Sequence, residues 1–500
     1  MEETVSITKQ MGKDALKDDV EKNQRETVVE TTINAEKFNG AFNEDDYIDA
    51  PPDGGYGWVC CACVSAMNFA TWGANGSFGI MLAFFLESDE FPGATATDYA
   101  LVVGLLNFFT LATMSTAGLM LFKFGYKATV SIGIVIQLSA YIGASFAKTI
   151  GQLQATQGFL LGLSFGIIFG ANSIVLPSWF LKKRAVANGF SHMGLGLGGM
   201  TFSLLNNSLI QRTGDHKWAL RAIGIISTVI CVITMFIVKV RVPKNSQFNK
   251  EDQSMKKILR GIFDLKVIKS WPLQLVTIWA TLATMAYTIC LFSLSNYART
   301  SLGLSENQAT NILVVFNLIQ GFGRPLTGVL SEVVGRVNFT MFATFYICFM
   351  VLVFWINLHT YASLVAFVVL LGLFVGISSV NIVPLSVDVV GLNGFPAAFS
   401  YSNVFVGSSV LVSEVIGLNL RDFSLKSHTP YFPCQLFVGA VYFAGLMVLI
   451  PYREWRVRRM MKQMKDTSSL EEATRTRYEK LANDNSLRGF ISRAFYITKI

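Results

Sequence analysis

Long apolar runs recur along most of this 500-residue chain and constrain its fold more than any other feature. A helix needs about 20 apolar residues to cross the hydrocarbon core of a bilayer, and a strand with an unpaired edge cannot lie there. The runs therefore predict an all-α polytopic membrane protein with twelve transmembrane helices. Their expected limits are 57–86, 99–122, 128–147, 151–177, 186–210, 218–239, 271–296, 307–331, 338–358, 361–386, 397–419 and 431–452.

The composition agrees with a membrane protein and excludes other classes. Hydrophobic residues make up 52% of the chain and charged residues 15%, whereas a soluble globular protein carries about 25% charged residues. The sequence holds no glycine-rich phosphate loop, no zinc-ligand spacing and no nucleic-acid-binding module. We therefore expect neither enzymatic activity nor a cofactor, a metal ion or a nucleic acid as a partner.

The charges between the apolar runs predict the orientation of the chain. Lys123, Lys127 and the basic loop 240–270 lie on one side, whereas the first loop on the other side carries acidic residues only. Loops rich in lysine and arginine face the cytosol, so both termini are expected there. The predicted organisation is an acidic cytosolic tail (1–50), a six-helix half (51–239), a basic cytosolic linker (240–270), a second six-helix half (271–452) and a basic cytosolic tail (453–500).

A repeated pair of glycines relates the two predicted halves. Gly118 lies near the end of the second span and Gly125 follows it, and Gly328 and Gly335 have the same places and spacing at the eighth span. This pattern resembles the Gly-x-x-x-Asp-x-x-Gly-Arg turn of major facilitator transporters, closely in the second half and in degenerate form in the first. The resemblance implies the major facilitator fold, with two six-helix halves around a site near the midplane.

Two further motifs resemble the signatures of the monocarboxylate transporter family, solute carrier family 16. Residues 51–58 read Pro-Pro-Asp-Gly-Gly-Tyr-Gly-Trp before the first span, and residues 179–189 read Trp-Phe-Leu-Lys-Lys-Arg-Ala-Val-Ala-Asn-Gly before the fifth. The resemblance covers about residues 50–452. By its residue type, Asp53 is also expected to cap the helix that follows it. The signature positions are Asp53, Gly54, Gly55, Gly57, Trp58, Lys182, Arg184 and Gly189.

The resemblance implies a multi-pass plasma-membrane transporter of monocarboxylates or related carboxylate-bearing solutes that works by alternating access. Its expected partners are a small carboxylate solute and the lipid bilayer. Some members of the family also need a single-span immunoglobulin-type chaperone, an expectation that comes from the family alone. An alternative from another class is a transporter-like receptor or scaffold that moves no solute.

Charged residues within a membrane span are costly and indicate function. Arg324 lies in the eighth span, and its planar guanidinium suits a carboxylate. The family carries a substrate-binding Arg-Pro at this place, which makes Arg324 the expected anchor. The alternative is an arginine that pairs with Asp388, Glu414 or backbone carbonyls to hold the halves together. Polar residues within spans either line the substrate cavity with Arg324 or form hydrogen bonds between helices. The candidates for the substrate site are Gln320, Asn75, Asn317 and Ser378.

Two departures from the family concern proton coupling. Proton-coupled members carry an aspartate four residues before this arginine and a lysine in the first span, where this chain has Gln320 and Gly76. An amide cannot carry a proton near neutral pH, so we expect facilitative transport without a coupled proton. The alternative is a proton-coupled lactate or pyruvate symporter in which another side chain carries the proton. The candidates for that relay are His192, Asp388 and Glu414.

Overall fold

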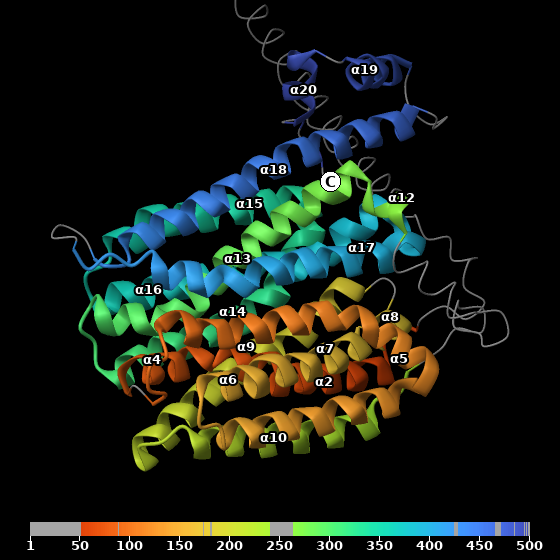
Figure 1. The fold of residues 1–500 in the computed structure, drawn as a ribbon. Helices are drawn as coiled ribbons and strands as arrows, with labels where there is room; N and C mark the ends of the chain where they lie inside the picture. Colours follow the sequence, from red (N-terminus) through yellow and green to blue (C-terminus); the bar gives the residue numbers. More distant parts are fainter. Residues whose placement is uncertain are drawn as a thin grey trace, which may run out of the picture. The chain divides into compact units, whose positions relative to one another are not determined.

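All regular elements that the computed structural model describes are helices (Figure 1). The predicted acidic tail 1–50, residues 241–263 of the predicted linker, Lys182 and the side chain of Arg184 lie outside the described part. The described residues are 52–88, 90–173, 175–180, 183–240, 264–424, 429–465, 472–484, 486–494, 496 and 498.

The N-terminal half contains the first six long helical segments. The first segment runs from α2 to α4 and includes a π-helical turn. The helix α5 contains the second and third segments. The fourth segment runs from α6 to α7 and also includes a π-helical stretch. Their bounds are α2 (Tyr56–Asn68), η2 (Phe69–Gly73), α3 (Ala74–Gly76), α4 (Phe78–Ser88), α5 (Ala96–Ser145), α6 (Ile150–Leu153), η3 (Gln154–Leu160), α7 (Leu161–Asn172), α8 (Val175–Trp179), α9 (Arg184–Thr213) and α10 (Lys217–Ile237).

The C-terminal half contains six further long segments, and two short helices follow it. A short interruption separates α16 from α17, and α17 holds the end of the tenth segment and all of the eleventh. The bounds are α12 (Leu265–Ile268), α13 (Trp271–Thr300), α14 (Glu306–Val334), α15 (Arg336–Phe349), η4 (Met350–Phe354), η5 (Trp355–Asn357), α16 (Tyr361–Gly372), α17 (Ile377–Asn419), α18 (Phe432–Lys465), α19 (Glu472–Asn483) and α20 (Leu487–Ala494).

Within the described residues, 11 helical segments are long and apolar enough to cross a membrane. The remaining long helix is α9, whose 30 residues include several glycines, asparagines and serines. It packs against the first segment on one side and against α14 of the other half on the other side. Because protein covers both of these faces, α9 needs less lipid-compatible surface than its neighbours, and the expected span 186–210 lies within it.

The second glycine of each repeated pair occupies an equivalent turn in its half. Gly125 has a φ of 78° and divides α5 into its two membrane segments, and Gly335 has a φ of 103° between α14 and α15. A positive φ is costly for residues with a Cβ and accessible to glycine. The same backbone requirement at both positions explains why the sequence repeats glycine there.

Glycines of α9 allow helix backbones to come into direct contact. A Cβ on Gly194 would lie 1.9 Å from the carbonyl oxygen of Ser65, and a Cβ on Gly196 would lie 2.4 Å from that of Asn317. Ser65 belongs to the first segment and Asn317 belongs to α14. The small-residue face of α9 therefore forms a seam between the halves, as small residues do at many membrane helix interfaces.

We predict that Gly196→Ala destabilises the protein, because the added methyl group would force α9 and α14 apart. Overpacking of this kind costs about 1–3 kcal/mol, so the midpoint of thermal unfolding in detergent should fall. Gly118→Ala is the matched control, since a Cβ on Gly118 would meet no described atom within 4 Å and alanine is the better helix former. An unchanged midpoint for Gly196→Ala would show that the seam is not tightly packed.

Candidate functional site

Arg324 lies in the middle of α14 and is 3% exposed. Its Nη2 donates hydrogen bonds to Gln320 Oε1 at 3.0 Å and to the Tyr287 hydroxyl at 3.4 Å. Within the described residues its Nε and Nη1 have no hydrogen-bond partner, and no carboxylate forms an ion pair with it. The guanidinium therefore carries a buried positive charge with free donors.

The side chains beside Arg324 form a chain of hydrogen bonds that crosses to the other half. The Tyr287 hydroxyl donates to Gln320 Oε1 at 2.8 Å, and Gln320 Nε2 donates to Asn317 Oδ1 at 3.0 Å. Asn317 Nδ2 in turn donates to the carbonyl oxygen of Gly76 at 3.4 Å. These bonds fix the orientation of the Gln320 amide, with its oxygen toward Arg324.

A break in the tenth membrane segment lies against the Arg324 side chain. Residues 373–376 are not α-helical, and a Cβ on Gly376 would lie 3.0 Å from Arg324 Cγ and 3.1 Å from its Nε. A Cβ on Gly323 would lie 2.5 Å from the carbonyl oxygen of Leu373. Interrupted membrane helices commonly line substrate sites in transporters, and here the interruption makes room for the arginine.

The structure brings three of the five predicted substrate-site residues together, namely Asn317, Gln320 and Arg324. Ser378 follows the helix break and accepts a hydrogen bond from Thr284 Oγ1 at 3.2 Å. Asn75 lies elsewhere: its Nδ2 donates to Asn107 Oδ1 at 2.8 Å, and it lines a small separate cavity within the N-terminal half. Asn75 is therefore not part of the Arg324 network.

Sequence reasoning missed Tyr287, Thr284 and Gly376. Tyr287 carries a usable signal, because a tyrosine in mid-span lies away from the membrane interfaces where tyrosine is enriched. Thr284 lies three residues earlier on the same helix, α13. Gly376 carries no signal by itself, since its role depends on an arginine side chain from another helix.

Gly76, the first-span position where the family resemblance leads one to expect a lysine in a proton-coupled carrier, is in van der Waals contact with the other half and with α9. A Cβ on Gly76 would lie 3.4 Å from Asn317 Oδ1 and 3.5 Å from Gly199 Cα. Gly76 and Gln320 are thus both engaged in the same neutral hydrogen-bond network.

Two of the three relay candidates have local partners. His192 Nδ1 lies 2.8 Å from the carbonyl oxygen of Asn188, one turn earlier on α9, so this nitrogen acts as the donor. Asp388 Oδ1 lies 3.2 Å from Arg336 Nη1, and its Oδ2 lies 3.7 Å from Arg456 Nη2. The two ion pairs favour a structural role for Asp388 at the end of the bundle near the basic loops.

Glu414 on α17 is different, because it is 1% exposed and has no ion pair among the described residues. Ser293 Oγ donates to its Oε1 at 2.8 Å, whereas its Oε2 has no hydrogen-bond partner in the described part of the chain. A buried carboxyl group with an unpartnered oxygen in a membrane span indicates a functional role. Glu414 therefore remains the strongest of the three relay candidates.

The two signature segments contact each other. The backbone N–H of Asp53 donates to the carbonyl oxygen of Trp179 at 3.1 Å, and the N–H of Lys183 donates to Asp53 Oδ1 at 3.1 Å. The expectation that Asp53 caps its own helix is wrong, because α2 has Gly55 at its N-cap and no side-chain cap. Asp53 instead binds the residue that precedes α9.

Aromatic and glycine residues complete this contact. The rings of Trp58 and Phe180 lie 4.9 Å apart with their planes inclined at 61°. A Cβ on Gly57 would lie 3.0 Å from Trp179 Cβ, and a Cβ on Gly189 would lie 2.9 Å from Pro325 Cα, next to Arg324. The signature glycines therefore permit close helix packing. Gly54 has no such close contact, and Gly55 adopts a φ of 57°.

Polar contacts join the halves at the outer end of the bundle, meaning the end opposite the basic loops. Asn307 Oδ1 accepts hydrogen bonds from Asn207 Nδ2 at 3.0 Å and from Gln211 Nε2 at 2.7 Å. Arg299 of α13 forms an ion pair with Glu87 of α4. These contacts close the outer side of the seam.

Comparisons with known proteins cover most of the chain. Residues 59–413 match the Major Facilitator Superfamily. "Uncharacterized transporter ESBP6" of Saccharomyces cerevisiae is 36% identical over 434 residues, which are 86% of this chain and 64% of that protein. "Probable transporter MCH2" of the same yeast is 30% identical over 392 residues, which are 78% of this chain and 81% of that protein. The match thus spans less than two thirds of the first relative.

A solved structure agrees with the fold. The transporter FucP, crystallised in the outward conformation, superposes with a TM-score of 0.56 at 14% sequence identity. The superposition covers 79% of this chain and 99% of FucP. At this identity the likeness concerns the fold alone, and it confirms the expected helical architecture.

The ion pairs of Asp388 lead to a stability prediction. Asp388→Asn should lower the free energy of unfolding by about 1–2 kcal/mol, because the charge-assisted hydrogen bond from Arg336 and the ion pair with Arg456 are weakened. Thermal unfolding in detergent measures the change. Glu306→Gln, which removes a carboxylate at the opposite end of the bundle, is the control. A midpoint no lower than that of the control would show that the pairs do not contribute to stability.

Proposed function

The chain belongs to the major facilitator superfamily, and on this premise we propose that it carries a monocarboxylate or a related carboxylate-bearing solute across the plasma membrane. Members of the superfamily move solutes through the bilayer by alternating access. The observation that carries the substrate class is Arg324, whose buried guanidinium has free donors and no carboxylate partner among the described residues.

A carboxylate substrate supplies what this site lacks. Burying an arginine without a counter-charge is unfavourable, and charge-assisted hydrogen bonds to a carboxylate are among the strongest in proteins. Gln320 and Tyr287 engage Nη2, so Nε and Nη1 remain for the substrate. The positive charge of Arg324 therefore favours an anion over a neutral solute and repels inorganic cations.

Binding of the anion would also favour the conformational change that moves the site from one side of the membrane to the other. A ligand shifts a conformational equilibrium only through different interaction free energies with the two states. An unpaired Arg324 disfavours any state that excludes water from it, and a bound carboxylate removes this cost. The bound anion should therefore lower the barrier to reorientation relative to the empty carrier.

We further propose that transport is facilitative. Gln320 and Gly76 occupy the positions of the ionisable partners in proton-coupled relatives, and both take part in a neutral network. A second candidate function, proton-coupled symport, is favoured by one observation. Glu414 is a buried carboxyl group with one unpartnered oxygen and no ion pair in the described residues.

We predict that Arg324→Ala lowers the rate of carboxylate uptake at least about 100-fold, since two or more charge-assisted hydrogen bonds are lost. Arg324→Lys keeps the charge without the planar fork and should retain an intermediate rate. Uptake into proteoliposomes measures both. Arg221→Ala, which removes an arginine of α10 that bonds Ser145, is the matched control. Full uptake by Arg324→Ala protein that is folded would refute the assignment.

We also predict that an inward proton gradient at zero membrane potential leaves the initial rate of uptake unchanged. A facilitative carrier has no group that binds a proton together with the substrate. The same assay with Glu414→Gln separates the two candidate functions. Acceleration by the gradient in the native protein, abolished in Glu414→Gln, would establish symport through Glu414 and overturn the facilitative proposal.

A further inference from the structure

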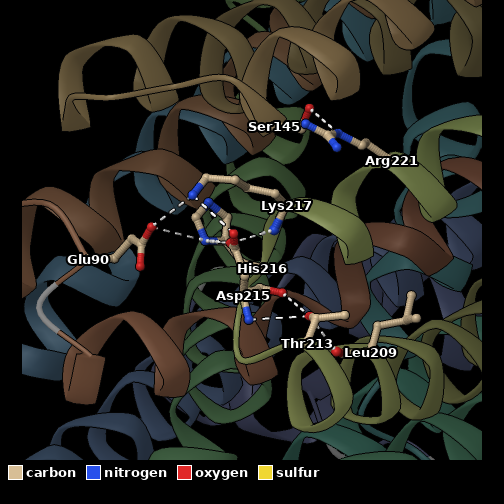
Figure 2. A network of polar contacts seen from close by, with 8 residues as sticks. All are labelled: Glu90, Ser145, Leu209, Thr213, Asp215, His216, Lys217 and Arg221. Atoms are coloured by element: carbon tan, nitrogen blue, oxygen red, sulfur yellow. Dashed lines mark hydrogen bonds and ion pairs between the residues drawn. The ribbon is translucent and has the colours of Figure 1, made fainter.

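A cluster of metal-ligating side chain types lies at the outer end of the N-terminal half (Figure 2). Glu90 comes from the loop between α4 and α5, and Asp215 and His216 come from the turn between α9 and α10. His216 Nδ1 lies 3.2 Å from Asp215 Oδ1 and 3.8 Å from Glu90 Oε1. One ligand atom from each of the three residues lies within 4.8 Å of the other two.

The imidazole of His216 is buried without a hydrogen-bond partner. The residue is 0% exposed, and neither ring nitrogen has a partner in the described residues. The rings of Phe84, Phe85 and Phe91 surround it at centroid distances of 6.2, 5.0 and 6.0 Å. Its Nδ1 points toward the two carboxylates (Figure 2). A buried polar group left in this way calls for an explanation, such as an ion.

Burial also keeps this imidazole suited to bind a metal ion. The apolar surroundings disfavour the charged imidazolium and lower the pKa of His216 below its usual value, although both carboxylates act in the opposite direction. A neutral ring retains the lone pair that a metal ion requires.

We propose that Glu90, Asp215 and His216 form a binding site for a divalent transition-metal ion, best fitted by Zn²⁺. Zinc binds imidazole nitrogen and carboxylate oxygen at about 2.0–2.2 Å, so two ligands of a tetrahedral site lie about 3.3–3.5 Å apart. The observed separations of 3.2 and 3.8 Å lie close to this value. Ca²⁺ and Mg²⁺ prefer all-oxygen shells, so a donor set with an imidazole favours zinc. The fourth position is open to water.

The ammonium group of Lys217 would compete with a metal ion for the carboxylates of this site. Its Nζ lies 3.0 Å from Asp215 Oδ2 and 3.5 Å from Glu90 Oε1, so the ammonium neutralises the same carboxylates. The Lys217 side chain is 37% exposed and can turn into solvent. A metal ion would therefore compete with Lys217 for Glu90 Oε1, and the two positive charges would repel each other. Removal of the lysine should strengthen the binding of zinc.

The proposal is tested on the purified full-length chain after treatment with a chelator. Thermal unfolding is followed while Zn²⁺ or Ca²⁺ is added, because a ligand that binds the folded state raises the midpoint in a saturable way. We expect saturable stabilisation by Zn²⁺ and none by Ca²⁺. Glu90→Gln should weaken zinc binding at least about 10-fold. Even the loss of a group that only hydrogen-bonds a metal ligand commonly weakens binding by this much. Lys217→Met should strengthen it.

The controls distinguish this site from weak binding elsewhere on the surface. Glu306→Gln removes an outer carboxylate that is not part of the cluster and should leave the zinc affinity unchanged. Co²⁺ provides a direct readout, because its visible absorption reports tetrahedral coordination and should be lost in Glu90→Gln. His216→Asn should also abolish binding, and if that variant does not fold, the opposite shifts of Glu90→Gln and Lys217→Met decide. No saturable effect of Zn²⁺, or equal affinity in the native protein and Glu90→Gln, would overturn the proposal.

Discussion

The seam formed by α9 is the contact on which the arrangement of both halves depends. Gly194 of α9 meets the backbone of the first segment, whereas Gly196 meets the backbone of α14. Close approach of this kind needs glycine, because van der Waals contact between backbones replaces the hydrophobic effect inside a membrane. The seam runs beside Asn317 and reaches Pro325 at Gly189, so the same contact also positions Arg324. Packing and substrate recognition are therefore not separable along this helix.

Arg324 is stabilised without being neutralised. Gln320 and Tyr287 supply acceptor oxygens for one of its nitrogens, and the interruption before α17 leaves space for its side chain. None of these groups carries a negative charge. A buried salt bridge would have satisfied the arginine permanently and left nothing for a substrate to contribute. Neutral hydrogen-bond partners stabilise the arginine in the folded protein, and its remaining donors can still bind an anion. A structural arginine, in contrast, has a permanent carboxylate partner.

Regular spacing explains which parts of the protein could be predicted from the sequence. Apolar runs of membrane length predict the helices, and Asn317, Gln320 and Arg324 share one helix face because they are three and four residues apart. Contacts between segments that are far apart in the chain leave no regular spacing in the sequence. Tyr287 reaches Arg324 from another helix, and Asp53 was assigned to its own helix although it binds the start of α9. Glu90 and His216 are 126 positions apart in the chain, so no metal-ligand spacing could reveal them.

The outer cluster and the Arg324 site adjoin different parts of one helix, α9. Thr213, the last residue of α9, donates its hydroxyl to the carbonyl oxygen of Asp215 at 2.9 Å, which ties the His216 turn to the end of the helix. Toward its other end α9 lies against Pro325. Gln211 and Asn207 contact Asn307 between these points. A movement that separates the halves on the outer side must break the Asn307 contacts and displace α9. A metal ion at the outer turn and an anion at Arg324 would therefore both bind next to residues that pack against α9.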